Sequence, residues 1–316
     1  MSGKIAFFLL LSFFITAVKA QPEAPFLLVL GIAQDAGFPQ ADCRKACCRK
    51  VWDGELPSAN VSCLGLADPA AGRFWLIDAT PDFREQLHKM EPCGQLSGIL
   101  LTHAHIGHYT GLMHLGREAM GAKGVPVYAM PRMRTFLEAN GPWSQLVELH
   151  NIELHSLSAD SAISLSPSIP HSSSPRLQIT PLSVPHRDEY SETVGFLIEG
   201  PDKKALYIPD IDKWQLWERD IRELIRQVDI AFLDGTFFAN GEIPGRDMSE
   251  IPHPFIEESL ALFGSLPEEE RAKVHFIHFN HTNPLLDAEG AAARRVREMG
   301  CGVGEEGMRF SLGGKN

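Results

Sequence analysis

Three histidines, His103, His105 and His108, fall within six positions of this chain. The residues before them, Gly98–Thr102, form a short apolar run rich in β-formers, which predicts a buried strand. The residues after them, Tyr109–Gly121, carry apolar side chains at helical spacing. In open α/β sheets, such junctions between a strand and a helix carry ligands. The cluster therefore predicts an α/β chain with a functional site at a sheet edge.

The spacing of these histidines indicates a metal site. His103 and His105 lie two positions apart, so an extended backbone points both imidazoles to the same side. Imidazole is a ligand that suits zinc, iron, copper or nickel. A lone histidine is usually a surface or core residue, but three at this spacing favour a metal ion.

The segment resembles the H-x-H-x-D-H motif of the metallo-β-lactamase fold hydrolases. That family adds a further histidine, a bridging aspartate and a last histidine, each at a strand end. The matching residues in this chain are His186, Asp210 and His278. The resemblance runs from about Phe26 to about Asp287. It implies a four-layer αββα sandwich, whereas periodicity alone indicates only an α/β fold.

Two subfamilies are more similar than the rest. The runs Gly37–Gln40 and Asn280–Pro284 resemble PqqB, the protein of pyrroloquinoline quinone biosynthesis. A cysteine cluster near the N-terminus resembles that of PhnP, the cyclic phosphodiesterase of phosphonate breakdown. The resemblance therefore implies a PqqB-like or PhnP-like protein.

Gly107 departs from the family motif, which has an aspartate there as a ligand of the second metal. Three protein ligands plus water can still hold a catalytic ion, but the second site should be weaker. The number and identity of the ions therefore remain open: the site could hold a single ion, a weakly bound second ion, or iron. On this basis Gly107→Asp should raise the occupancy of the second site. The expected first site is His103, His105, His186 and Asp210, and the second is His108, His278 and Asp210.

The six cysteines allow two interpretations. Disulfides are common in exported chains. The resemblance to PhnP implies instead a structural zinc, with His281, three residues after His278, as the fourth ligand. Its predicted shell is Cys43, Cys47, Cys48 and His281. The spacing differs from the family's, so Cys63 could replace one of these thiols. Cys93 and Cys301 are predicted to be buried or paired.

Hydrolysis also needs a proton donor for the leaving group. PhnP-like and RNase-Z-like relatives place a histidine that reaches the active site where this chain has His253. The alternative is an exposed loop histidine. Its place before an expected helix should lower its pKa, unless a carboxylate offsets this. Asp212 is predicted to be the N-cap of a helix over 213–227.

Other polar residues near the strand ends receive supporting roles. Asp78 is expected to organise the metal-binding loop, and Asp234 to orient His186 or His278. Asn280, Thr282 and Asn283 are expected to fix loop geometry or to contact substrate. The remaining histidines of interest are interpreted as structural or surface residues: His150, His155, His171 and His275.

The first twenty residues are typical of a signal peptide. Lys4 precedes the apolar run Ile5–Val18, and small residues at Val18 and Ala20 predict cleavage before Gln21. The run is short of the ~20 residues that span a bilayer, which disfavours an uncleaved anchor. We therefore expect one domain over 21–316, located in the periplasm or secreted.

Charge favours a small-molecule substrate. The chain has a formal net charge of −11, and removing Lys4 and Lys19 gives −13. Nucleic-acid binding usually requires a basic stripe, and only a local cluster around Arg49 is present. Three functions remain: an exported hydrolase of a phosphodiester or small ester using Zn2+, Mn2+ or Fe2+, a PqqB-like iron-dependent oxidoreductase, and a non-catalytic metal-binding module.

Overall fold

The computed structural model describes residues 23–165 and 177–313. The expected signal peptide, residues 1–20, lies outside these ranges. So does most of the surface loop that the Ser-Pro-rich run 163–176 suggests, although Ile163–Ser164 forms a short strand. Among the described residues, every helix is too short or too polar to cross a membrane.

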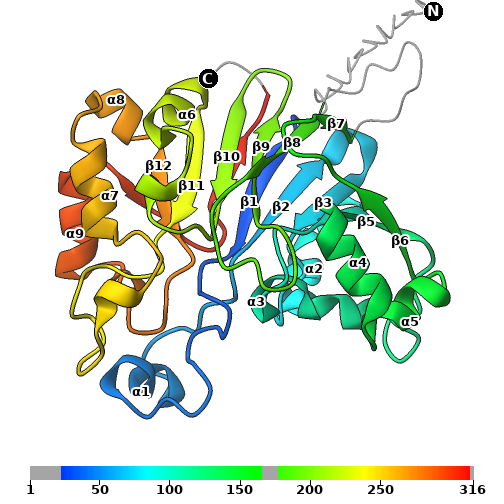
Figure 1. Cartoon of the computed structure of the whole chain (residues 1–316), viewed down its shortest axis with the longest axis horizontal. Coiled ribbons are helices and arrows are strands. Elements are labelled where there is room, and N and C mark those ends of the chain that lie inside the picture. The colour runs from blue at the N-terminus through cyan, green and yellow to red at the C-terminus, as the bar shows by residue number, and fades with distance from the viewer. Residues whose placement is uncertain (1–22, 166–176, 314–316) are drawn as a thin grey trace, which may run out of the picture.

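Two seven-stranded mixed sheets form the centre of the molecule (Figure 1). The first sheet has the order β14 (Arg309–Ser311), β1 (Phe26–Gly31), β2 (Cys63–Asp68), β3 (Arg73–Ile77), β4 (Gln95–Leu100), β5 (Val125–Ala129) and β6 (Ile152–Ser156). The second has the order β13 (Gly302–Val303), β12 (Val274–Ile277), β11 (Ile230–Asp234), β10 (Lys204–Ile208), β9 (Val194–Glu199), β8 (Gln178–Ser183) and β7 (Ile163–Ser164).

Helices cover the outer face of each sheet (Figure 1). Those beside the first sheet are α2 (Phe83–Met90), α3 (Ile106–Tyr109), α4 (Pro131–Ala139) and α5 (Trp143–Glu148). Those beside the second are α6 (Ile221–Gln227), α7 (Ile256–Phe263), α8 (Glu268–Arg271) and α9 (Ala291–Glu298). The short helix α1 (Ala46–Trp52) lies apart from both sheets. This arrangement confirms the expected αββα sandwich.

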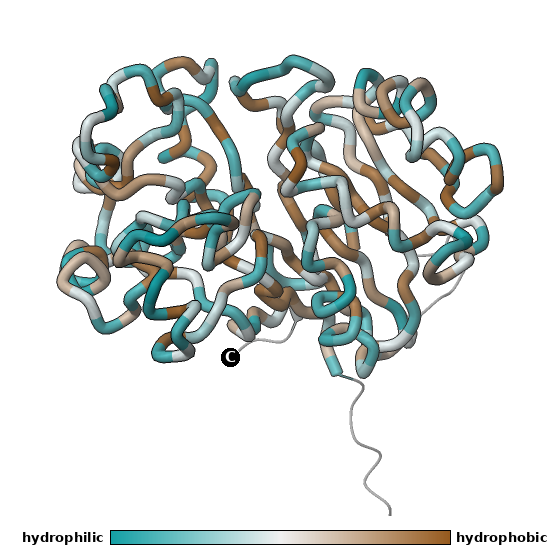
Figure 2. Tube along the Cα trace, turned by 90° about the horizontal axis from the view of Figure 1, so that it is seen from below, coloured by the Kyte–Doolittle hydropathy of each residue, from teal (hydrophilic) through white to brown (hydrophobic). Residues whose placement is uncertain are grey.

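Strand alternation divides the apolar side chains among three cores. Trp75 and Ile77 of β3 point between the sheets, whereas Phe74 and Leu76 point toward the outer helices. Both faces of the strand are therefore apolar, as expected for a sheet covered on both sides. In Figure 2 the hydrophobic colouring follows the strands, and the hydrophilic colouring is concentrated in the outer loops.

Two expected helices are shorter than the sequence pattern predicts. The pattern over Tyr109–Gly121 becomes only a 3-10 helix at Thr110–Leu115, which follows the short helix α3. Here the backbone packs closely, because a Cβ on Gly111 would lie 2.1 Å from the Thr80 oxygen. The helix predicted over 213–227 is likewise reduced to a 3-10 turn and α6.

A short segment after β1 joins the two sheets. Ala33 forms bridges to Val61, just before β2 of the first sheet, and to Phe279, just after β12 of the second. Ile32 and Phe279 are joined by a 2.7 Å hydrogen bond from the Phe279 N–H to the Ile32 oxygen. Segments far apart in the sequence are thereby held side by side next to the strand ends.

Candidate metal centre

The ends of strands from both sheets meet at one point. His103 follows β4, His186 follows β8 and Asp210 follows β10. His103 Nε2 lies 3.3 Å from Asp210 Oδ2, and His186 Nε2 lies 3.3 Å from Asp210 Oδ1. His105 Nδ1 lies 3.9 Å from Asp210 Oδ2. The structure therefore brings together the four residues predicted for a first metal site.

A second group of residues also approaches Asp210. His108 Nε2 and His278 Nε2 are 3.3 Å apart, and each lies 3.9 Å from Asp210 Oδ2. A residue that the sequence analysis missed, Asp35, also lies here, with Oδ1 3.1 Å from His108 Nε2. Asp210 thus faces both groups, as the expected bridging role requires.

The residues fit a metal ion. Around a tetrahedral ion with bonds of about 2.0–2.1 Å, ligand atoms lie roughly 3.3 Å apart, close to the spacings observed here. Five of the atoms that face the centre are buried and have no hydrogen-bond partner among the described residues. They are Asp35 Oδ1, His103 Nε2, His105 Nδ1, His186 Nε2 and Asp210 Oδ1. Converging polar atoms left without partners are costly unless an ion binds them.

Four of the five expected histidine ligands hold Nδ1 in a hydrogen bond and leave Nε2 for an ion. His108 Nδ1 donates to Asp78 at 2.7 Å, and His186 Nδ1 donates to Asp212 at 3.0 Å. Such partners fix the ring and its tautomer, as metal-binding histidines commonly require. The other two bonds run from His103 Nδ1 to Thr102 Oγ1 at 2.9 Å and from His278 Nδ1 to Thr236 Oγ1 at 2.9 Å.

The aspartates at the strand ends differ in part from expectation. Asp78 accepts the Thr102 N–H at 2.8 Å, so it organises the metal-binding loop as predicted. Asp212 was expected to cap a helix, but the N-cap of α6 is Asp220, and Asp212 accepts from His186 instead. The prediction for Asp212 was wrong because the residues after it form only a 3-10 turn.

His253 is buried beside the centre and is not an exposed loop residue. Its Nδ1 lies 2.8 Å from Asp234 Oδ2 and 3.2 Å from Asp210 Oδ1. Burial alone would lower the pKa of His253, but the charges of Asp234 and Asp210 outweigh it and raise the pKa to about 9. The lowering expected from the helix terminus is therefore offset. Asp234 orients His253 directly and reaches His278 only through Thr236.

Asp210 is the electrostatic centre of the site. Burial would raise the pKa of this carboxyl, but His186, His253 and His278 hold it well below its usual value. Burial and the neighbouring His108 also lower the pKa of the His103 imidazole, well below 6.5. A charged carboxylate facing neutral imidazole is the state that a metal ligand set needs.

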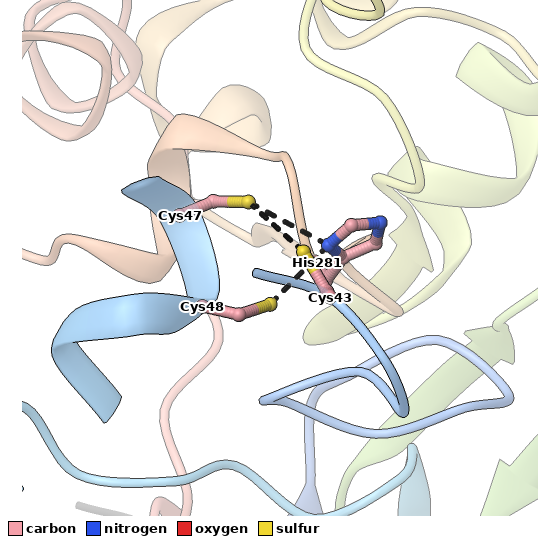
Figure 3. Close-up of side chains that lie close together, drawn as sticks. All are labelled: Cys43, Cys47, Cys48 and His281. Carbon is pink, nitrogen blue, oxygen red and sulfur yellow. Dashed lines mark hydrogen bonds between the residues drawn. The ribbon is translucent and has the colours of Figure 1, made fainter. Parts of the chain in front are cut away.

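A separate cluster brings together the cysteines of the N-terminal loop (Figure 3). Cys47 Sγ lies 3.7 Å from Cys43 Sγ and 3.6 Å from His281 Nδ1, and Cys48 Sγ lies 3.3 Å from the same nitrogen. These spacings are close to the roughly 3.5–3.8 Å edges of a tetrahedral zinc shell with sulfur ligands. The four residues predicted for a structural zinc are therefore adjacent.

The remaining cysteines lie elsewhere. All six cysteines are unpaired, so the structure contains none of the disulfides considered as an alternative. Cys63 does not join the cluster; it is buried on β2, with Sγ 3.6 Å from the Asp78 oxygen. Cys93 is half-buried and Cys301 is buried.

A cavity of about 450 Å³ adjoins the centre at His253. Arg187 and Arg246 line it, together with Asn280 and one carboxylate, Glu250. Asn280 therefore faces the space that a substrate could occupy. Asn283 has the other expected role, because its side chain donates to the Gly235 oxygen at 2.7 Å and accepts from the Leu285 N–H. Thr282 donates to Glu242 and is thereby fixed.

Of the histidines interpreted as structural or surface residues, three fall in the described ranges. His150, His155 and His275 take no part in the groups above. His171 lies outside the described residues.

Sequence comparison assigns the family. A family model described as "Beta-lactamase superfamily domain" matches residues 73–279, which is more than half of the chain. The chain belongs to this superfamily. Coenzyme PQQ synthesis protein B of Methylococcus capsulatus is 27% identical over 310 residues, covering 90% of this chain and 99% of the relative.

Solved structures show the same fold. Zn2+-bound PqqB from Methylobacterium extorquens has a TM-score of 0.75 and 21% identity, covering 91% of this chain and 100% of that one. A diphosphatase of the PhnP family has a TM-score of 0.62 and 23% identity, covering 90% of this chain and 96% of that one. The chain is thus a β-lactamase superfamily protein that is similar in sequence to PqqB and shares its fold with PqqB and with the PhnP-family diphosphatase, and its histidine and aspartate clusters support a metal cofactor.

Proposed function

We propose that this β-lactamase superfamily protein is a metal-dependent hydrolase of a small anionic substrate, most directly a phosphodiester. The observation that carries the proposal is a centre with unpartnered ligand atoms that adjoins, at His253, a cavity bearing Arg187 and Arg246. Guanidinium groups bind phosphate or carboxylate oxygens, so such a cavity suits an anion. Small esters with an acidic group remain in the same substrate class.

In this proposal the residues of the centre and the cavity have separate roles in hydrolysis. His103, His105, His186 and Asp210 would hold a zinc ion, and His108 and His278 a second one. A bound ion supplies an activated water and polarises the oxygen of the bond to be broken. Arg187 and Arg246 hold the substrate by its charge. His253, with Nδ1 held by Asp234, gives a proton from Nε2 to the leaving group.

The proposal is tested with the full chain loaded with Zn2+ or Mn2+ and bis-p-nitrophenyl phosphate. Asp210→Asn should lower kcat by roughly two to three powers of ten or more, the scale of losing one electrostatic group from an active site. Asp42→Asn is the matched control, because Asp42 is an exposed carboxylate, 90% accessible, that pairs with the equally exposed Arg44. Absence of turnover with either ion, on this and on carboxylic ester substrates, would contradict the proposal.

A PqqB-like redox function is the second candidate. It is favoured by relatives named for coenzyme PQQ synthesis that align over 99% of their length. In that case the same His and Asp ligands would hold iron, which two histidines and a carboxylate suit. Iron content in the purified chain together with oxygen uptake would favour this function over hydrolysis.

Export is part of the proposal. A small-molecule hydrolase with the N-terminal pattern of residues 1–20 would act in the periplasm or outside the cell, without a lasting membrane anchor. Mass spectrometry of the protein from a periplasmic fraction should find Gln21 at the N-terminus. An intact Met1 in a cytoplasmic fraction would contradict export and leave the chemistry as proposed.

A further inference from the structure

Gly107 stands where the superfamily motif has an aspartate, and the structure shows what fills the space of that missing side chain. A Cβ built on Gly107 would lie 2.3 Å from Asp35 Oδ1 and 2.5 Å from Asp35 Cα. Gly107 lies in α3 and its φ is not positive, so its backbone conformation does not require glycine. The close approach of Asp35 is the reason that only glycine fits.

Asp35 points its carboxylate at the second group of histidines. Its Oδ1 lies 3.1 Å from His108 Nε2 and 3.9 Å from His278 Nε2. That oxygen is buried and lacks a hydrogen-bond partner among the described residues, although the side chain as a whole is 17% exposed. The ligand atoms of Asp35, His108 and His278 all lie within 4.8 Å of one another. Asp210 Oδ2 lies 3.9 Å from both imidazoles.

We propose that Asp35 is the carboxylate ligand of the second metal ion and replaces the motif aspartate that is absent at Gly107. The second site is then His108, His278, Asp35 and Asp210, which has as many protein ligands as the first. This inference rests on the metal centre but not on the reaction, because its test measures ion binding alone.

The backbone around Asp35 is well suited to hold a ligand. The Gln34 N–H donates to the Phe279 oxygen at 2.8 Å, and the Phe279 N–H donates to the Ile32 oxygen at 2.7 Å. Phe279 directly follows His278, so these two bonds fix Asp35 relative to its partner imidazole. The expectation that Gly107→Asp raises occupancy is therefore reversed, since the new side chain must displace the backbone of residue 35.

The test is a Mn2+ titration of the full chain, followed by the electron paramagnetic resonance signal of the free ion. Mn2+ suits the His and carboxylate ligands, whereas thiolates select zinc, so the cysteine cluster does not interfere. The wild-type chain should bind about two Mn2+ ions and Asp35→Ala about one. The ion held by His103, His105 and His186 reports that the variant is folded. Asp42→Asn, in the same loop, is the control that should bind as the wild type does.

Two milder variants decide the matter if Asp35→Ala does not fold. Asp35→Asn keeps the shape but removes the charge, and should weaken the second ion about 10–100-fold or more. Gly107→Ala keeps every ligand but pushes on Asp35, and should also weaken the second ion. A wild-type isotherm in the Asp35 variants, or a wild-type chain that takes only one Mn2+ at saturation, would overturn the proposal. Two bound ions without any hydrolysis would contradict only the proposed function.

Discussion

The cysteine cluster and the histidine–aspartate centre differ in the chemistry of their ligands, although His278 and His281, one from each, are only three residues apart. Three thiols and one imidazole form the first, and four ligands of this kind complete a tetrahedral zinc shell. The second combines imidazoles with the carboxylates Asp35 and Asp210, and a cavity with two arginines adjoins it.

The difference separates a structural role from a chemical one. Three thiols and one imidazole are typical of a structural zinc site, whereas the histidine–aspartate centre has two adjoining groups of ligands and meets a cavity with two arginines at His253. Burial raises the pKa of the Cys48 thiol to about 12, so this thiol stays protonated unless an ion binds it. We expect zinc at the cysteine cluster to stabilise the N-terminal loop, and the ions at the other centre to act on substrate.

The comparison is tested most strongly at His281. His281→Ala should remove one zinc ligand and lower the free energy of unfolding by about 2–4 kcal/mol, with a smaller effect on turnover. Thermal unfolding and zinc content measure this change. His281→Cys is the matched variant, because a fourth thiolate can replace the imidazole in the shell. Native unfolding with lost turnover in both variants would assign His281, which also lines the cavity, to the substrate site.

Asp212 and Asp220 allow a sharper test of the other centre. Asp212→Ala removes the partner of His186 Nδ1 and should weaken the first ion about 10–100-fold. Asp220→Ala removes the N-cap of α6 and should cost about 1 kcal/mol of stability without a change in ion affinity. Ion titration and chemical unfolding of both variants separate the two roles. Equal ion affinity in Asp212→Ala and the wild type would contradict the orienting role of Asp212.

The smallest effect is expected at Cys63. Because Cys63 is buried on β2, away from the cysteine cluster, Cys63→Ala should leave the zinc content unchanged. Its stability should fall by about 1 kcal/mol from the lost packing. Zinc analysis after gel filtration measures the zinc content directly. A Cys63→Ala chain without zinc would return Cys63 to the ligand set that the sequence left open.

The sequence predicts the fold and most of the centre because the expected ligands either lie close together in the chain or follow strands in a recognisable order. His103, His105 and His108 are adjacent in the chain, and their spacing alone indicates a metal. His186, Asp210 and His278 follow apolar strands in the order that the superfamily uses. Each of these ligands was placed at the end of a strand, and the end of a strand can be predicted from an apolar run.

The sequence could not reveal Asp35 or the role of Asp212, because these depend on tertiary contacts. Asp35 precedes Gly37 in what reads as an ordinary turn, and its partner Gly107 is remote in the sequence. The only available signal was the absence of a carboxylate at Gly107, which implies a replacement without locating it. Asp212 precedes an amphipathic pattern that resembles a helix, but the chain turns there to let its carboxylate reach His186.

The bridging segment at Ala33 has a consequence for how the two halves of the molecule stay together. Each proposed ion position would take ligands from both sheets: His103, His105 and His108 follow a strand of one, and His186, Asp210 and His278 follow strands of the other. A bound ion would therefore link the two sheets, in addition to the backbone pairing of Ala33 and Phe279. Metal binding would therefore add to the contacts that already hold the two sheets together.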